Sequence, residues 1–173
     1  MKKFLCLLIL LSVMYSFAQA QPDESKIYNA KQVGLTFSTL GGAGIHYIAP
    51  SSEKDNMKFT GIYIYSDNNS EKSSYFSLGV EYQRDLIEGE DRRGYVAIGG
   101  HIDNDLSEGL YFEENSNRQS YFSIGTGLGL DFGSTDKGII LNAHLTYQLT
   151  TGLAGTDRTR IGLGGGVGLG FNF

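Results

Sequence analysis

Tryptophan is absent from the 173 residues, and cysteine and proline are scarce, with one and two copies. The only cysteine, Cys6, lies in the apolar N-terminal stretch, so we expect no disulfide and no thiol chemistry downstream of it. No helix-period apolar pattern follows that stretch, and the 24 glycines would destabilise helices. The formal net charge of −5 offers no basic patch for nucleic acid. The composition predicts an all-β chain that does not bind nucleic acid.

The N-terminus has the three parts of a secretory signal peptide. Lys2 and Lys3 form a basic region, an apolar run extends from Phe4 to about Val13, and Ala18 and Ala20 are the small residues of a cleavage site. The alternative, a membrane anchor, is less favoured because a spanning helix needs ~20 apolar residues. We therefore expect a signal peptide over residues 1–20 and one domain over residues 21–173.

Eight segments of alternating apolar and small or polar residues follow, separated by turn residues. The predicted strands are 28–40, 44–50, 57–66, 73–86, 94–103, 118–132, 138–150 and 158–173. The acidic segment 103–117 is predicted to be a long outer loop. Within it, residues 110–112 (Leu-Tyr-Phe) either extend a strand or form a contact patch for a partner.

The last three predicted strands carry large apolar residues on one face and glycine or uncharged polar residues on the other. In 138–150 the apolar face holds Ile139, Leu141, Ala143, Leu145, Tyr147 and Leu149, and the other face holds Ile140, Asn142, His144, Thr146 and Gln148. In the closing strand the apolar residues alternate with Gly162, Gly164, Gly166, Gly168 and Gly170. Residues 138–156 contain no charged side chain, which is unusual for a surface in contact with water.

A transmembrane β-barrel explains this pattern, because its apolar face meets lipid and its small or polar face fills a narrow interior. Closure pairs every backbone group, and eight strands leave room only for side chains. The aromatic residues agree with two girdles at the membrane surfaces. The outer girdle is predicted to contain Phe37, Tyr65, Phe76, Phe122 and Tyr147, and the inner one Phe59, Tyr82, Phe132, Phe171 and Phe173. A soluble secreted β-barrel or sandwich domain is the alternative.

The C-terminal strand resembles the assembly signal of bacterial outer-membrane proteins. Its terminal Phe173 is preceded at every second position by Phe171, Leu169 and Val167. In length and strand number, residues 21–173 are similar to the small OmpA/OmpX-type barrels. That resemblance implies location in the outer membrane, contact with its lipids and recognition of the last strand by the barrel-assembly machinery.

An enzymatic reading has a few candidate residues. Some eight-stranded barrels modify lipid A, using a histidine with a serine or an acid. The candidates here are His46, His101, His144, Glu81 and Asp103, and the spacing of His144 and Thr146 is similar to the His-x-Ser arrangement of the deacylases. No acid partner for that pair is evident, and the histidines have no metal-site spacing.

We therefore expect these polar residues to hydrogen-bond one another inside the barrel. The predicted inner residues are Glu81, Gln83, His101, Asn142, His144 and Gln148. The sequence predicts an eight-stranded antiparallel up-and-down barrel without catalytic, cofactor or metal sites. We expect a monomer with a structural or surface-interaction role, and the lipid A-modifying enzyme is the alternative.

Overall fold

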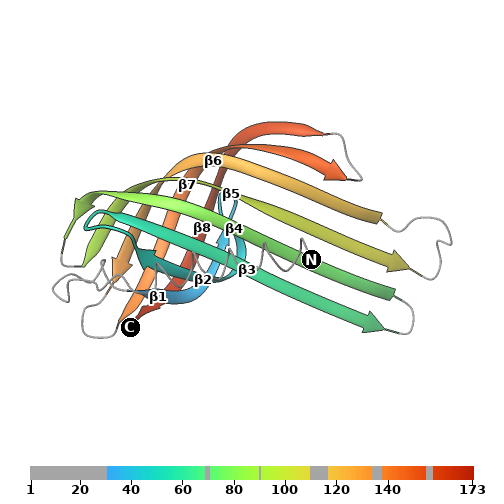
Figure 1. Cartoon of the computed structure of the whole chain (residues 1–173), viewed down its shortest axis with the longest axis horizontal. Helices are drawn as coiled ribbons and strands as arrows, with labels where there is room; N and C mark the ends of the chain where they lie inside the picture. The colour runs from blue at the N-terminus through green and yellow to red at the C-terminus, as the bar shows by residue number, and fades with distance from the viewer. Residues whose placement is uncertain (1–30, 69–70, 90, 110–116, 134–137, 155–157) are drawn as a thin grey trace, which may run out of the picture.

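Eight antiparallel strands follow one another in sequence order around a closed barrel (Figure 1). The computed structural model describes residues 31–68, 71–89, 91–109, 117–133, 138–154 and 158–173. The strands are β1 (Gln32–Ser38), β2 (Gly42–Pro50), β3 (Asp55–Asn68), β4 (Glu71–Glu88), β5 (Arg92–Gly109), β6 (Asn117–Gly133), β7 (Ile139–Ala154) and β8 (Thr159–Asn172). The barrel closes because β1 pairs with β8 as well as with β2. The predicted all-β, eight-stranded up-and-down barrel is confirmed.

The described ranges hold no helix that is long and apolar enough to cross a membrane.

Most predicted strand boundaries differ from the structure, and those of the first and fifth strands are among the most in error. The first strand begins at Gln32 and ends at Ser38, so residues 39 and 40 belong to a turn. The fifth strand continues to Gly109, although we expected a loop from residue 103. Its polar outer part pairs with β4 through Asp103↔Ser77 and with β6 through Asp103↔Tyr121. The polar composition of residues 103–109 is compatible with a loop, but backbone pairing with β4 and β6 keeps them in the sheet. The signal peptide and residues 110–112 lie outside the described residues.

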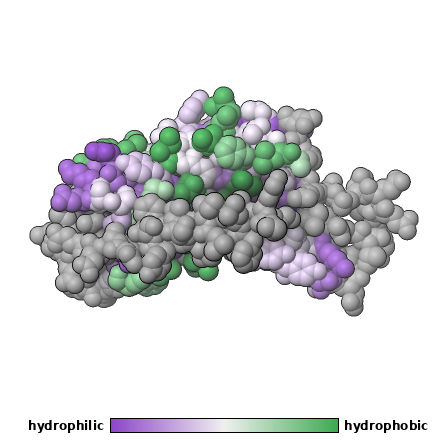
Figure 2. Space-filling model, viewed as in Figure 1, coloured by the Kyte–Doolittle hydropathy of each residue, from purple (hydrophilic) through white to green (hydrophobic). Residues whose placement is uncertain are grey.

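The two faces of the barrel have inverted polarity. The predicted apolar face of β7 is exposed at every position from Ile139 to Leu149, and Asn142 and Thr146 on its other face are buried. The glycines at 162, 164, 166, 168 and 170 of β8 likewise face inward, while Leu163 and Val167 are exposed. Figure 2 shows apolar side chains over the middle of the visible outer surface and hydrophilic ones toward its ends. The predicted alternation in β7 and β8 is therefore confirmed.

The hairpin formed by β1 and β2 is much shorter than the rest of the barrel. β1 has 7 residues and β2 has 9, whereas β4 and β5 have 18 each. The longer strands continue past the tip of this hairpin (Figure 1). We call the end of the barrel that carries this tip the outer end. The hairpin tip lies within the wall that the other strands form, and its residues define the candidate site.

Candidate functional site

The tip of the β1–β2 hairpin folds into the barrel. Leu40 is 1% exposed and packs in a cluster with Tyr95 and Ala97 from the inner face of β5. His101 Nδ1, also on β5, lies 2.9 Å from the carbonyl oxygen of Leu40. An apolar side chain from one wall thus reaches the opposite wall and closes the barrel at this level.

Glycine permits this inward fold. Gly42 has a φ of 78°, a left-handed conformation that favours glycine. A side chain on Gly41 would collide with the Glu81 carboxylate, because its Cβ would lie 2.1 Å from Glu81 Oε1. A Cβ on Gly79 would lie 2.1 Å from the carbonyl oxygen of Gly41. Gly42 therefore begins β2 in a conformation that favours glycine, and Gly41 and Gly79 allow the tip to lie close to β4.

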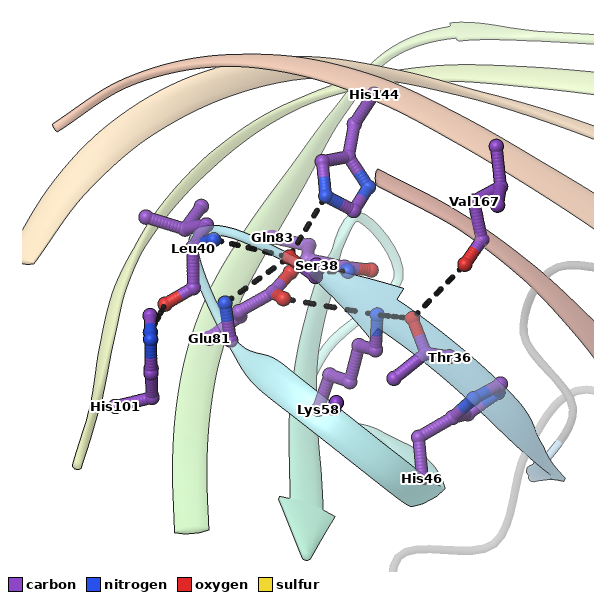
Figure 3. Close-up of polar contacts among 12 residues, drawn as sticks. Thr36, Ser38, Leu40, His46, Lys58, Glu81, Gln83, His101, His144 and Val167 are labelled. Atoms are coloured by element: carbon purple, nitrogen blue, oxygen red, sulfur yellow. Dashed lines mark hydrogen bonds and ion pairs between the residues drawn. The ribbon is translucent and has the colours of Figure 1, made fainter. Parts of the chain in front are cut away.

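Ser38 is the hydrogen-bond centre of the tip (Figure 3). Its Oγ accepts hydrogen bonds from the backbone N–H groups of Leu40 at 3.0 Å and Gly41 at 3.1 Å. It also lies 2.7 Å from His144 Nε2 on β7. Because both acceptor positions of the hydroxyl are occupied, its proton is left to donate to the imidazole. Next to it, Thr39 Oγ1 lies 2.8 Å from Thr146 Oγ1, so two residues of β7 hold the tip.

A row of buried charges extends from the tip toward the other end of the barrel, which we call the inner end. Lys58 Nζ lies 3.6 Å from Glu81 Oε1 and donates a hydrogen bond to Thr36 Oγ1 at 3.2 Å. Gln83 continues the row, because its Nε2 donates to Glu81 Oε2 at 3.2 Å. Arg93 Nη2 then donates to Gln83 Oε1 at 2.9 Å. Polar side chains from β1, β3, β4 and β5 thereby cross-link the interior.

Arg93 ends this row in a cluster of its own. Its guanidinium binds Asp131 on β6 at 2.9 Å and Asp85 on β4, and it lies 4.4 Å from the centre of the Tyr95 ring. The Arg93 side chain is 2% exposed, so the cluster is desolvated. A buried cation is tolerated because carboxylates and an amide occupy its donors.

All the predicted inner residues face the interior. Glu81 and Gln83 are 1% exposed, His101 and Asn142 are 6% exposed, and His144 and Gln148 are partly buried. His46, one of the enzymatic candidates, is also buried, and its Nε2 lies 3.2 Å from Gln32 Oε1. His101 Nε2 lies 3.1 Å from Asp103 Oδ2 toward the outer end. His46, His101 and His144 therefore have different hydrogen-bond partners and do not form one cluster.

The geometry gives the predicted His144–Thr146 pair a structural role. Each residue bonds a different tip residue, and they do not bond each other. His144 Nδ1 has no hydrogen-bond partner among the described residues, so no carboxylate in that part of the chain orients the ring. Ser38 has the distance of a nucleophile–base pair, but its oxygen already accepts two backbone hydrogen bonds. Among the described residues, no group of three or more His, Cys, Asp or Glu side chains could hold a metal ion.

The four residues of the predicted assembly signal lie in a row at the inner end of β8. Val167, Leu169, Phe171 and Phe173 are 63%, 39%, 47% and 71% exposed on the outer surface. Leu169 pairs with Leu35 on β1 and Leu141 on β7. The row therefore continues onto both neighbouring strands as an apolar surface.

Sequence reasoning missed Lys58, Arg93 and the inward tip. Alternation alone could have placed Lys58 inside, because Asn56 and Thr60 share its face and are buried with it. It could not have paired Arg93 with Asp131, since the strand register determines that contact. Alternation along β6 does place Asp131 on the inner face, where it is buried.

Solved structures of other proteins have a similar fold. Neisserial surface protein A matches with a TM-score of 0.51 and 12% identity, over 83% of this chain and 93% of that one. The N-terminal β-barrel domain of Pseudomonas aeruginosa OprF matches with a TM-score of 0.53 and 19% identity, over 84% of this chain and 98% of that one. No family model and no curated protein matches the sequence. At these identities the likeness concerns the fold, which is the eight-stranded barrel predicted from the sequence.

Proposed function

We propose that the protein is a small outer-membrane barrel, exported by a cleaved signal peptide, with a structural or surface-interaction role and no enzymatic activity. The observation that supports this is the inverted polarity of the barrel. Lys58, Glu81 and Arg93 are 1–2% exposed, whereas Leu145 and Leu163 are 61% and 77% exposed. Only an apolar surrounding makes such an outer surface favourable.

The alternative of a soluble β-domain requires the opposite arrangement. In water, each exposed leucine would leave apolar area unburied at a cost of about 25 cal/mol per Å². The outward residues of β6, β7 and β8 form one continuous apolar surface, since Leu145 adjoins Leu128 and Tyr147 adjoins Leu163. Soluble monomers rarely expose contiguous apolar surfaces of this kind.

A non-enzymatic role is supported by the use of the candidate residues. Ser38, His144 and Thr146 hold the hairpin tip, and Glu81 is engaged by Lys58 and Gln83. The barrel interior is occupied by these contacts, so a structural role or contacts made by the outer loops explain the molecule better than a reaction inside it.

The partners proposed for this barrel are outer-membrane lipids and the barrel-assembly machinery. Recognition of the last strand is supported by the exposed row Val167, Leu169, Phe171 and Phe173, because these alternate apolar residues of β8 are accessible on the outer surface. We propose a monomer, since closure through the β1–β8 pairing leaves no open edge at the inner end.

Fractionation of the native host tests the location. We expect the protein in the outer-membrane fraction after an alkaline wash, released only by detergent, with faster gel migration before heating than after it. Phe173→Ser should reduce the membrane-assembled form, while Phe132→Ser, on the outer surface at the same end, should leave assembly intact. Recovery of the wild-type protein in the wash without detergent would favour the soluble domain.

A further inference from the structure

The short hairpin leaves the outer part of the barrel wall incomplete. β2 pairs with β3 only as far as Ile45↔Gly61, and β1 pairs with β8 only as far as Ser38↔Gly166. β3 continues to Asn68, and β8 begins at Thr159. In the described part of the chain no strand lies between Ile62–Asn68 and Thr159–Gly165. We call this opening the lateral gap, and with two strands missing it is roughly 14 Å between strand axes.

The lateral gap lies at the level of the apolar outer surface. Ile161 and Leu163, on the gap side of β8, are 64% and 77% exposed. They lie opposite Leu149 and Tyr147 of β7, which belong to the same apolar surface. The gap therefore opens toward the acyl region that the proposed membrane insertion would place around the barrel.

The inner surface beside the gap is apolar on one side. Ile62 and Ile64 continue the inner face of β3, which below them carries the buried polar residues Asn56, Lys58 and Thr60. Ile64 is 52% exposed and lies opposite Tyr75 of β4. The inner surface of β3 is therefore polar and charged on the inner side of the hairpin tip, and apolar and accessible on its outer side.

Open space faces this wall from β8. A Cβ on Gly162 would have no described atom within 4 Å, whereas a Cβ on Gly164 would lie 2.2 Å from Thr39 Oγ1. The hairpin tip therefore fills the barrel at Gly164 and leaves it open one inward position farther out. We call the space between Ile62, Ile64 and Gly162 the vestibule, and the tip forms its floor.

A cation, Arg160, lies at the mouth of the vestibule. Alternation along β8 places Arg160 on the same face as Gly162, one inward position farther toward the outer end. Arg160 is exposed, and its side chain has no hydrogen bond or ion pair with any described residue. An apolar wall with one cation at its outer end is complementary to an anionic head group carrying an acyl chain.

We propose that the vestibule binds the acyl chain of an anionic amphiphile that enters from the outer leaflet through the lateral gap. The chain packs on Ile62 and Ile64, and the head group binds Arg160. This site goes beyond the structural role proposed above and rests on the membrane insertion proposed there.

The absence of tryptophan makes a quenching experiment direct. Ile64→Trp places a single fluorophore in the vestibule, and Leu163→Trp places one on the lipid-facing surface. Each variant is folded into phosphatidylcholine vesicles containing either dibromostearate, an anionic single-chain probe, or brominated phosphatidylcholine at the same bromine content. We expect dibromostearate to quench both fluorophores. Brominated phosphatidylcholine should quench Leu163→Trp strongly and Ile64→Trp weakly.

Second substitutions in the Ile64→Trp background test the site itself. Gly162→Phe should fill the vestibule and remove most of the dibromostearate quenching, while Gly162→Ala, the matched control, should leave it unchanged. Arg160→Gln should raise the dibromostearate concentration for half-maximal quenching roughly fivefold, the effect of one cation near a membrane surface.

Failure of the proposed membrane insertion and failure of the vestibule proposal give different results. If Leu163→Trp is not quenched by brominated phosphatidylcholine, membrane insertion is wrong, and this proposal is wrong with it. If dibromostearate quenches Leu163→Trp but not Ile64→Trp, only the vestibule proposal is overturned. The same holds if Gly162→Phe leaves the quenching of Ile64→Trp by dibromostearate intact. If the emission intensity of Ile64→Trp depends on the protein-to-lipid ratio and not on the bromine content, a second copy of the protein covers the gap. That result would also overturn the vestibule proposal.

Discussion

Glycines on the inner face of β8 have different surroundings although they follow one sequence pattern. A Cβ on Gly166 would lie 2.4 Å from His144 Nε2 and 2.6 Å from the carbonyl oxygen of Phe37. A Cβ on Gly162 would have no described neighbour. The alternating glycines therefore mark a narrow interior near the hairpin tip and a wider one beyond it.

Gly166→Ala and Gly162→Ala form a matched pair that tests this difference. Gly166→Ala should lower the free energy of unfolding by about 1–3 kcal/mol, the usual cost of overpacking. Gly162→Ala should be neutral or stabilise by roughly 0.4–1 kcal/mol, because alanine restricts the unfolded chain. Urea unfolding in lipid vesicles measures both, and equal effects would mean that the interior is not narrowed at the tip.

Among the buried polar residues, we expect substitution of Arg93 to lower the free energy of unfolding most. Arg93→Met would remove the buried cation that binds Asp85 and Asp131, at a cost of about 3–5 kcal/mol in the free energy of unfolding. Arg92→Met is the control, because the Arg92 side chain is 71% exposed and should change stability by no more than about 0.5 kcal/mol. Similar losses for the two variants in the same unfolding assay would contradict the structural role of the buried cluster.

At the scale of elements, the alternation of apolar and polar residues predicted those features that depend on one strand alone. The faces of β6, β7 and β8 followed from alternation, because each side chain's direction is set by its own strand. The lengths of β1 and β5 did not follow, since polar residues such as Asp103 are compatible with a loop or with a strand end. The inward tip depends on distant partners, namely Leu40 with Tyr95 and Ser38 with His144, which no local pattern relates.

The hairpin tip should also close the barrel to solutes. Leu40 is packed against Tyr95 and Ala97, and the row from Lys58 to Arg93 fills the interior below them. We expect no steady conductance from the folded protein in planar bilayers, as for other eight-stranded barrels filled by side chains. A porin in the same bilayers verifies the recording, and gel migration before heating verifies folding. Large, stable open currents would show that the tip leaves the interior.

The whole molecule combines a charged interior with an apolar exterior, and these two properties depend on each other. Closure of the wall lets backbone groups pair internally, which an apolar surrounding requires. The outer surface is then free to be apolar, and the chain's few inward charges, such as Lys58 and Glu81, compensate one another. The sequence could indicate this inversion because glycine and uncharged polar residues replaced the charges that a soluble surface needs.

Depth in the membrane gives the most direct test of that arrangement. Leu145 lies in the middle of β7 on the outer surface and is 61% exposed, with Leu128 beside it. Leu145→Arg should lower the free energy of unfolding in lipid vesicles by about 2–4 kcal/mol, because the cation meets hydrocarbon. Thr159→Arg, at the outer end of β8, should cost no more than about 1 kcal/mol, since a charge near the interface stays hydrated. If both variants keep wild-type stability, the leucine-rich surface is not in contact with lipid, and the soluble β-domain becomes the better description.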